Sequence, residues 1–423
     1  MLNQSNTRLN YPGYTFDFEA AALRLKDVVN RTPLIRHPNL SRKYKANIYL
    51  KREDLQEVRS FKIRGAYNLM SSLPWEQIKT GVVCASAGNH AQGFAYSCNK
   101  LGVPGVVFMP VITPNQKIRQ TKKFGNHFIE IKLIGDTYDE CAIAAKQYCE
   151  TNRLTYIHPF DHYKIIEGQG TIGIEILEDL SNIDFLFIPV GGGGLCAGVG
   201  TYFHKHSPQT KIIGVEPEGA PSMKTALNKG EPVTLPSIDR FVDGAAVQRV
   251  GNITFGLCKE SLTEMHLVPE GKICSAILSI YNEDAMVVEP AGILSVAALD
   301  DYADAIRGKN VVCIITGSNN DIDRMQEIKE RSLQHEGLKH YFLIRFAQRP
   351  GSLKDFVNDI LGPGDDVTRF EYVKKQNKES GPALVGIEVR SRNDYRQLLI
   401  NLEKYQMNYS ELKQEDLAFG YLV

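Results

Sequence analysis

Short apolar, β-branched runs alternate with helix-like stretches through about the first 330 residues of this chain. Strand, helix and strand in this order and at this spacing are typical of parallel sheets covered by helices. The region therefore predicts an α/β fold of one or two lobes. The predicted strands are Asn47–Leu50, Gly81–Ser86, Gly105–Met109, His127–Ile131, Phe185–Val190, Lys211–Val215 and Val311–Ile315, with helices such as Ala91–Lys100 and Tyr138–Thr151 between them.

The pattern changes near residue 330, where the charged stretch Asp321–Leu338 favours helix and shows no strand signal. The elements predicted beyond it are strands at Tyr341–Ala347, Thr368–Lys374 and Ala383–Val389, helices at Leu353–Leu361 and Asp394–Tyr405, and a last short strand. This β-α-β-β-α-β order is ferredoxin-like. We expect one domain over residues 1–335 and a separate α+β domain over residues 339–423.

Charge and composition exclude several classes of partner. The chain has 49 Lys and Arg residues and 49 Asp and Glu residues, so its net charge is zero. It therefore has no long-range positive field to attract nucleic acid. No apolar run approaches the roughly 18 residues of a membrane span. The first thirty residues contain Asp17, Glu19 and Asp27 and lack the apolar core of a signal peptide. The eight cysteines are scattered without metal-ligand spacing, which predicts buried, reduced thiols in a cytosolic protein.

A run of glycines marks the first candidate site. The apolar strand Phe185–Val190 leads directly into Gly191–Gly194 and Leu195, and the helix-like stretch Cys196–His204 follows. Glycines let backbone N–H groups approach an anion, and a helix N-terminus favours negative charge. A tight turn alone rarely needs four consecutive glycines, so the pattern predicts a phosphate site.

The glycine run leaves the kind of phosphate open. Gly192, Gly194 and Ala197 satisfy G-x-G-x-x-G/A, and Glu216 follows about 20 residues later at the end of a strand. A nicotinamide dehydrogenase is therefore an alternative. Against it, such a turn normally comes early in its domain, whereas some 190 residues precede this one.

Lys62 is the candidate nucleophile. It lies between Phe61 and Ile63, with Arg64 nearby, and a helix begins at about Gly65. A lysine in a partly apolar setting loses its proton more easily, and an unprotonated amine can form a Schiff base. On spacing alone, a surface lysine is the simpler interpretation.

The loop Ser86–Ala91 follows an apolar strand and opens a helix. Ser86 is a natural helix N-cap, and the free N–H groups of the first turn suit a carboxylate. Asn89 can donate or accept a hydrogen bond. His90, taken alone, is more often a packed histidine than a catalytic one.

Together these motifs resemble the biosynthetic threonine dehydratase (threonine ammonia-lyase) family, which has fold type II of the pyridoxal-phosphate enzymes. In family order, the matches are Thr32–Leu34, the cofactor-lysine motif Ser60–Ala66, the substrate-carboxylate loop Ser86–Ala91, the cofactor-phosphate loop Gly191–Leu195, Glu289–Gly292 and the pyridine-nitrogen loop Thr316–Asn319. The likeness covers about residues 15–335 and implies a two-lobed catalytic region like that of tryptophan synthase β. The C-terminal domain resembles the single ACT-like regulatory domain of the short form.

The resemblance implies a role for each motif. Lys62 would hold pyridoxal 5′-phosphate covalently and then remove the α-proton of L-threonine, giving 2-oxobutanoate and ammonia. L-Serine would react more slowly. The other cofactor contacts would be Asn89, Thr316 and the backbone of Gly191, Gly192, Gly193, Gly194 and Leu195. The substrate carboxylate would be bound by Ser86, Gly88 and Asn89.

Two positions refine this expectation. Thr316 offers the pyridine nitrogen a hydroxyl and no negative charge, which keeps the ring neutral and favours prompt β-elimination over transamination. Related serine racemases bind a divalent ion through two acids, and here Glu216 matches the first but Ser222 stands in place of the second. We therefore predict no divalent metal and leave a monovalent cation open.

The ACT-like domain implies feedback inhibition by isoleucine, with valine as a further candidate effector, in a homotetramer. The turn Arg349–Leu353 offers a helix N-terminus to an amino-acid carboxylate, although a plain strand–helix connection explains it equally well. A serine or threonine racemase, a catabolic dehydratase and a non-catalytic amino-acid sensor remain alternatives beside the dehydrogenase. Absorbance near about 410 nm would separate the cofactor class from the dehydrogenase.

Overall fold

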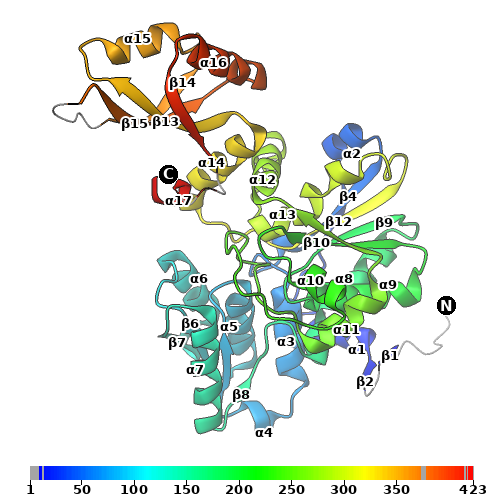
Figure 1. Cartoon of the computed structure of the whole chain (residues 1–423). Coiled ribbons are helices and arrows are strands. Elements are labelled where there is room, and N and C mark those ends of the chain that lie inside the picture. The colour runs from blue at the N-terminus through cyan, green and yellow to red at the C-terminus, as the bar shows by residue number, and fades with distance from the viewer. Residues whose placement is uncertain (1–8, 12–13, 373–377, 414–415, 417, 423) are drawn as a thin grey trace. The chain divides into compact units, whose positions relative to one another are not determined.

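The alternating region and the region beyond it lie in two compact units. The computed structural model describes residues 9–11, 14–372, 378–413, 416 and 418–422. The chain divides into two units, Met1–Ile322 and Asp323–Val423. Each is described on its own below (Figure 1).

A six-stranded sheet forms the larger part of the first unit. Its strands lie in the order β11-β10-β9-β12-β4-β3, and all neighbours are parallel except β3 and β4. The bounds are β3 Leu34–Arg36, β4 Asn47–Arg52, β9 Phe185–Pro189, β10 Lys211–Pro217, β11 Glu264–Val268 and β12 Asn310–Ile315. Every residue of β9 is buried, as expected for a parallel strand that helices cover on both faces.

A second, four-stranded parallel sheet has the order β7-β6-β5-β8. Its strands are β5 Val82–Ala85, β6 Gly105–Met109, β7 Ile129–Leu133 and β8 Thr155–Tyr156. Val82, Cys84 and Val107 pack towards α5 (Asn89–Leu101), whereas Val83 and Phe108 pack towards α7 (Tyr138–Thr151). Figure 1 shows this sheet and its helices as one layered lobe.

Close helix contacts join the two lobes of the first unit. In α8 (Tyr163–Asp179), a Cβ at Gly168 would lie 2.6 Å from the Arg64 carbonyl oxygen of α3 (Lys62–Ser72). In α9 (Gly194–His206), a Cβ at Gly198 would lie 2.3 Å from the Ile166 carbonyl oxygen. Only glycine permits this spacing, so α3 and α9 are held against α8.

The remaining elements of the first unit surround these sheets. They are the antiparallel pair β1 Leu9–Tyr11 and β2 Tyr14–Phe16, the helices α1 Phe18–Leu25, α2 Pro38–Tyr44, α4 Trp75–Ile78, α6 Asn115–Gly125, α10 Ser222–Lys229, α11 Asn252–Ser261, α12 Glu270–Asp284 and α13 Pro290–Ala297, and the 3₁₀ turns η1 Glu53–Leu55, η2 Asn126–Phe128 and η3 Leu299–Tyr302. The turn η2 explains why β7 begins two residues later than the predicted strand His127–Ile131.

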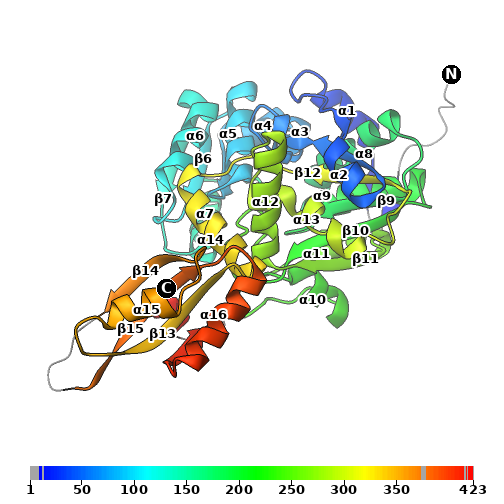
Figure 2. The ribbon, with the colours of Figure 1, turned by 90° about the horizontal axis from the view of Figure 1, so that it is seen from above.

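The second unit has the predicted β-α-β-β-α-β order. After η4 Ile322–Arg324 and α14 Met325–Glu336 come β13 Lys339–Ala347, α15 Ser352–Asp359, β14 Asp366–Tyr372, β15 Ser380–Glu388, α16 Arg392–Lys404, β16 Asn408–Leu412 and α17 Phe419–Leu422. The sheet order is β14-β15-β13-β16, antiparallel throughout. Figure 2 shows α15 and α16 on one face of this sheet, where Phe356 and Leu398 join its core. The end of the predicted strand Thr368–Lys374 lies outside the described residues.

Two sequence expectations concern the whole chain. All eight cysteines are buried and none forms a disulfide, as predicted. Within the described ranges, no helix combines the length and the apolar character needed to cross a membrane.

Candidate active site

Lys62, the first residue of α3, lines two adjoining cavities of the first unit. The larger, of about 560 Å³, is also lined by Ser86, Gly88, Asn89, Gly192, Glu289 and Asn319. The smaller is lined by Gly191, Gly192, Gly193, Gly194, Leu195 and Thr316. Every site residue predicted from the sequence therefore lines one or both cavities.

The amine of Lys62 lies in a low-polarity position. Its Nζ donates to the Pro159 carbonyl oxygen at 3.2 Å and lies 5.2 Å from the centre of the Phe61 ring. Burial lowers the pKa of Lys62 to about 8, and the Glu289 carboxylate opposes this shift. Burial thus gives an amine that loses its proton near neutral pH.

The chain before Lys62 is paired with the loop that carries Thr316. The Phe61 N–H donates to the Thr316 carbonyl oxygen at 3.1 Å, and the Ser318 N–H donates to the Arg59 carbonyl oxygen at 3.0 Å. Ser60 also forms a β-bridge with Gly317. These contacts fix the lysine segment against the predicted pyridine-nitrogen loop.

The glycine loop connects β9 to α9 and leaves an open cradle. A Cβ at Gly192 would lie 2.4 Å from the Phe160 ring, and one at Gly191 would lie 3.0 Å from the Ala245 backbone. Gly193 has a φ of +93°, which side chains disfavour. The first N–H groups of α9 have no acceptor within the helix, so they can bind an anion here. Backbone donors on a side-chain-free surface fit the phosphate of the predicted cofactor.

The loop between β5 and α5 offers a second helix N-terminus. Its Ser86 Oγ accepts from the Gly88 N–H at 3.2 Å, while the N-cap is Gly88, which makes no side-chain cap bond. The prediction that Ser86 caps the helix is therefore wrong by two residues. A Cβ at Gly88 would meet no atom within 4 Å, so the space above the loop is open. A carboxylate can reach these N–H groups.

Thr316 is buried, and its hydroxyl donates to the Ala291 carbonyl oxygen at 3.2 Å. Thr316 follows the end of β12, and its polar group is a neutral hydroxyl. The residue lines the smaller cavity together with Lys62 and the glycine loop. A neutral hydroxyl fits the predicted contact with a ring nitrogen, since it can donate or accept.

A chain of polar side chains, which the sequence did not predict as a unit, lines the larger cavity. Asn89 Nδ2 donates to Glu289 Oε1 at 2.6 Å, and Asn319 Nδ2 donates to Asn89 Oδ1 at 2.7 Å. Burial, followed by the nearby Asp243 carboxylate, raises the pKa of Glu289 to about 7. The sequence signal was the match at Glu289–Gly292, which carried no assigned role.

Two other candidates have structural roles. His90 is buried with its Nε2 at 3.1 Å from the Ile157 carbonyl oxygen, and burial lowers its pKa to about 3, so it is a neutral packed histidine. Both oxygens of Glu216 accept backbone N–H groups, from Met223 at 2.7 Å and from Lys224 at 2.9 Å. Its carboxylate thus holds the start of α10. The described ranges contain no group of three His, Cys, Asp or Glu side chains placed to hold a metal ion.

The comparisons with known proteins agree with this geometry. Residues 25–317 match the pyridoxal-phosphate dependent enzyme family, and residues 330–422 match the C-terminal regulatory domain of threonine dehydratase. The L-threonine dehydratase biosynthetic IlvA of Halalkalibacterium halodurans is 55% identical over 408 residues, 96% of this chain and 98% of that protein. Its Bacillus subtilis counterpart is 55% identical over 400 residues, 94% and 95% of the two chains.

Solved structures give the same result for the first unit. The processed form of threonine deaminase isoform 2 from Solanum lycopersicum superposes with a TM-score of 0.72 at 42% identity, over 74% of this chain and 92% of that one. Maize serine racemase superposes with a TM-score of 0.69 at 28% identity, over 76% and 98% of the two chains.

Proposed function

This chain belongs to the pyridoxal-phosphate-dependent enzymes and, within them, to the biosynthetic L-threonine dehydratases, and on that premise we propose how its residues divide the work. It is a lyase that uses pyridoxal 5′-phosphate to deaminate L-threonine to 2-oxobutanoate and ammonia. The observation that carries the proposed roles is that the Lys62 amine, the glycine loop and Thr316 line one cavity.

In this proposal four parts of the chain contact the cofactor. Lys62 binds it covalently, backbone N–H groups of Gly191–Leu195 bind its phosphate, and Thr316 meets its ring nitrogen. Asn89 contacts the ring hydroxyl. When bound, pyridoxal phosphate supplies the electron sink for the charge that develops as the substrate loses its α-proton. The hydroxyl of Thr316 carries no charge, so it cannot hold a proton on the ring nitrogen by ion pairing.

The substrate is bound and deprotonated by groups of the larger cavity. Ser86, Gly88 and Asn89 hold the L-threonine carboxylate at the start of α5, where the helix dipole favours an anion. The free amine of Lys62 takes the α-proton. Its lowered pKa of about 8 suits this role, because a general base works best when its pKa is near the working pH.

The further expectations from the sequence remain part of the proposal. They are a catalytic domain over residues 1–335 and an ACT-like regulatory domain over residues 339–423. The regulatory domain binds isoleucine, and valine is a further candidate effector. The enzyme deaminates L-serine more slowly, forms a homotetramer and is located in the cytoplasm. The match of residues 330–422 to a regulatory domain supports feedback by an amino acid. Such an effector acts only if it binds two conformations of the enzyme unequally.

The test is 2-oxobutanoate formation from L-threonine by the wild type, by Lys62→Ala and by Lys229→Ala, each with and without isoleucine. Lys229 is exposed in the last turn of α10 and serves as the matched control. We expect Lys62→Ala to lose turnover and the absorbance near about 410 nm of a cofactor bound to lysine. We expect Lys229→Ala to keep both.

The two parts of the proposal can fail separately. Turnover retained by Lys62→Ala would contradict the role of the lysine. Turnover that isoleucine does not reduce would leave the chemistry intact and contradict the feedback. Turnover measured after valine is added to the isoleucine-inhibited enzyme shows whether valine opposes the inhibition.

A further inference from the structure

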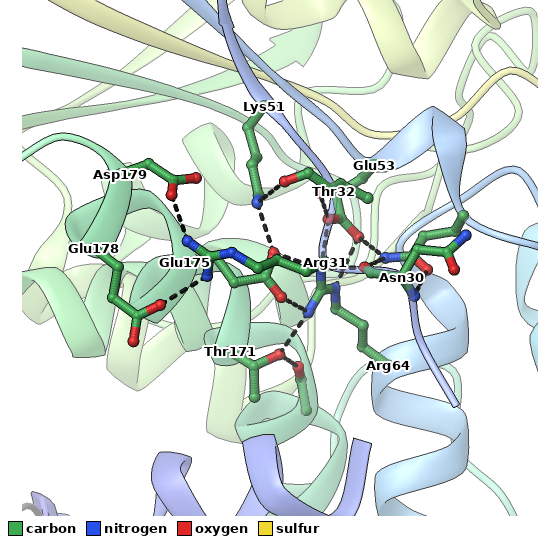
Figure 3. Close-up of polar contacts among 12 residues, drawn as sticks. Asn30, Arg31, Thr32, Lys51, Glu53, Arg64, Thr171, Glu175, Glu178 and Asp179 are labelled. Atoms are coloured by element: carbon green, nitrogen blue, oxygen red, sulfur yellow. Dashed lines mark hydrogen bonds and ion pairs between the residues drawn. The ribbon is translucent and has the colours of Figure 1, made fainter. Parts of the chain in front are cut away.

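Behind the active site, four charged side chains meet inside the first unit: Lys51, Glu53, Arg64 and Glu175. We call them the buried charge cluster. Figure 3 shows Arg64 between Glu53 and Glu175, with Lys51 on the far side of Glu175. None of the four lines either cavity of the site. The two cations and two anions give the cluster no net charge.

Arg64 is bound on two sides. Its Nε and Nη2 donate to the two oxygens of Glu53 at 2.8 and 2.7 Å. Its Nη1 and Nη2 donate to the two oxygens of Glu175 at 2.7 and 3.0 Å. Two bidentate pairs of this kind fix the plane of the guanidinium, which a lysine amine cannot reproduce.

The neighbours complete the cluster. Lys51 Nζ donates to Glu175 Oε2 and to the Thr32 carbonyl oxygen, both at 2.6 Å. The Thr32 hydroxyl donates to Glu53 Oε1 at 2.5 Å. Lys51 and Glu53 are 0% exposed and Arg64 is 1% exposed. Burying this many charges is costly, and well-packed apolar residues would often serve stability equally well. The cluster therefore calls for a reason other than stability alone.

The charges of the cluster do not shift the pKa of the catalytic amine directly. Burial and the Glu289 carboxylate account for the pKa of Lys62, and no member of the cluster contributes. Any influence on Lys62 must therefore be geometric. Arg64 is two residues from Lys62 on the first turn of α3, so fixing its side chain fixes the start of that helix.

Glu53 and Arg64 also enclose the segment that meets the Thr316 loop. The pair joins residues eleven positions apart, and Lys62 lies between them. Within this segment, Phe61 and Arg59 make the backbone bonds to Thr316 and Ser318, and the Asp54 carbonyl oxygen accepts from the Ser318 hydroxyl at 3.3 Å. On the Glu53 side, Lys51 of β4 is paired with Ile314 of β12, the strand that ends one residue before Thr316.

We propose that the Arg64–Glu53 pair is a positioning device that closes the 53–64 segment and thereby sets the Lys62 amine against the Thr316 loop. This inference rests on the proposed role of Lys62. In it Arg64 is a positioning residue, which acts through the backbone and touches neither substrate nor cofactor. Glu175 and Lys51 hold the pair in place from α8 and β4.

The test compares variants that alter the pair with one that alters a neighbouring ion pair. Arg64→Lys keeps the charge and loses the forked geometry, Glu53→Gln keeps the shape and loses the charge, and Thr32→Val removes one bond to Glu53. Arg31→Lys is the control, because Arg31 pairs with Glu178 and Asp179 of the same helix α8 at a half-exposed edge.

The first readout is amide hydrogen exchange of the apoprotein, which does not depend on catalysis. We expect exchange in the 54–62 segment and at Ser318 to quicken by about tenfold or more in Arg64→Lys and Glu53→Gln, with little change in β9 and β10. Thr32→Val should show a smaller effect in the same segment. Arg31→Lys should match the wild type.

The second readout is the division of the kinetic effect between kcat and KM for L-threonine. We expect kcat of Arg64→Lys and Glu53→Gln to fall about 10- to 100-fold, the scale of a displacement near 1 Å at a reacting group. KM should change less than about threefold, because the four cluster side chains make no bond to the Ser86–Ala91 loop, which the 53–64 segment reaches through the side chain of Asn319. The kcat of the double variant should be no lower than the kcat of the less active single variant, because both changes remove the same contact.

Three results would overturn the proposal. They are unchanged exchange in the 54–62 segment, exchange that quickens equally throughout the unit, and a loss confined to KM. If Arg64→Lys and Glu53→Gln fail to fold, Thr32→Val decides through the same readouts. If Lys62→Ala keeps its turnover, the proposed role of Lys62 is wrong. The hydrogen-exchange measurement still tests whether the Arg64–Glu53 pair holds the segment closed.

Discussion

The side-chain amide of Asn89 donates to the Glu289 carboxylate at 2.6 Å, inside the cavity that both residues line with Lys62. This bond favours the charged form of Glu289, while burial favours the neutral form and prevails. The charge of Glu289 in turn favours the protonated amine of Lys62. The residue proposed to contact the cofactor ring thus also stabilises the charged form of the carboxylate beside the catalytic lysine.

Glu289→Gln should lower the pKa of Lys62 in the apoprotein below its wild-type value of about 8. A carboxylate stabilises the cationic amine, so removing its charge makes proton loss easier. The glutamine oxygen can still accept from Asn89. The measurement is the rate at which an amine-selective reagent acylates Lys62 as a function of pH. The exposed Glu231→Gln serves as control. A midpoint that stays in place or rises would contradict the assignment.

Gly192→Ala should weaken pyridoxal phosphate binding by at least about tenfold, because interior sites tolerate added methyl groups poorly. The new Cβ would lie 2.4 Å from the Phe160 ring, so the ring or the loop must move. Titration of the apoprotein with the cofactor, followed by absorbance, measures the dissociation constant. Gly362→Ala in the second unit should bind the cofactor like the wild type. Equal affinity in Gly192→Ala would show that the loop does not hold the phosphate.

His90→Gln should make the enzyme less sensitive to acid. Burial lowers the pKa of His90 to about 3, below the unfolded value of 6.5, so wild-type stability is full above pH 6.5 and is lost as the pH falls towards 3. Between pH 7 and pH 5 this one group accounts for about 2 kcal/mol. Glutamine keeps a donor for the Ile157 carbonyl oxygen and does not titrate. Urea unfolding at both pH values measures the difference, and an equal loss in both proteins would refute it.

Glu53→Gln should reduce the free energy of unfolding by about 3–5 kcal/mol, since it leaves Arg64 charged and only partly paired inside the protein. Arg31→Ala, which breaks an exposed ion pair, should cost less than about 1 kcal/mol. Both are measured by urea unfolding at pH 7. Similar small losses in the two variants would mean that water or a shifted side chain compensates the buried charge.

Much of the fold follows from local pattern. Strands such as β9 are apolar on both faces, so their runs are visible in the sequence, and the ferredoxin-like order of the second unit was predicted correctly. The edge strands β3, β8 and β11 were missed, because each is short and only partly buried. The distribution of strands between two sheets was also not predictable, because it depends on contacts between distant parts of the chain.

The site shows the same limit. The residues lining the cavities were named from motifs, but the partners of Arg64 were not. Its guanidinium is paired with the carboxylates of Glu53 and Glu175. Glu175 is 111 positions away from Arg64, and Glu289 is 200 away from Asn89. No local pattern reveals such partners.

The short span of the Arg64–Glu53 pair has a consequence for how the enzyme is made. A contact eleven positions apart closes at little entropic cost, whereas the bond from Ser318 to Asp54 spans 264 positions. Contacts of short range form early in folding and those of long range late. The nascent chain can therefore shape the lysine segment long before the strand that leads into Thr316 has been synthesised, and β12 completes the active site as the last strand of its sheet.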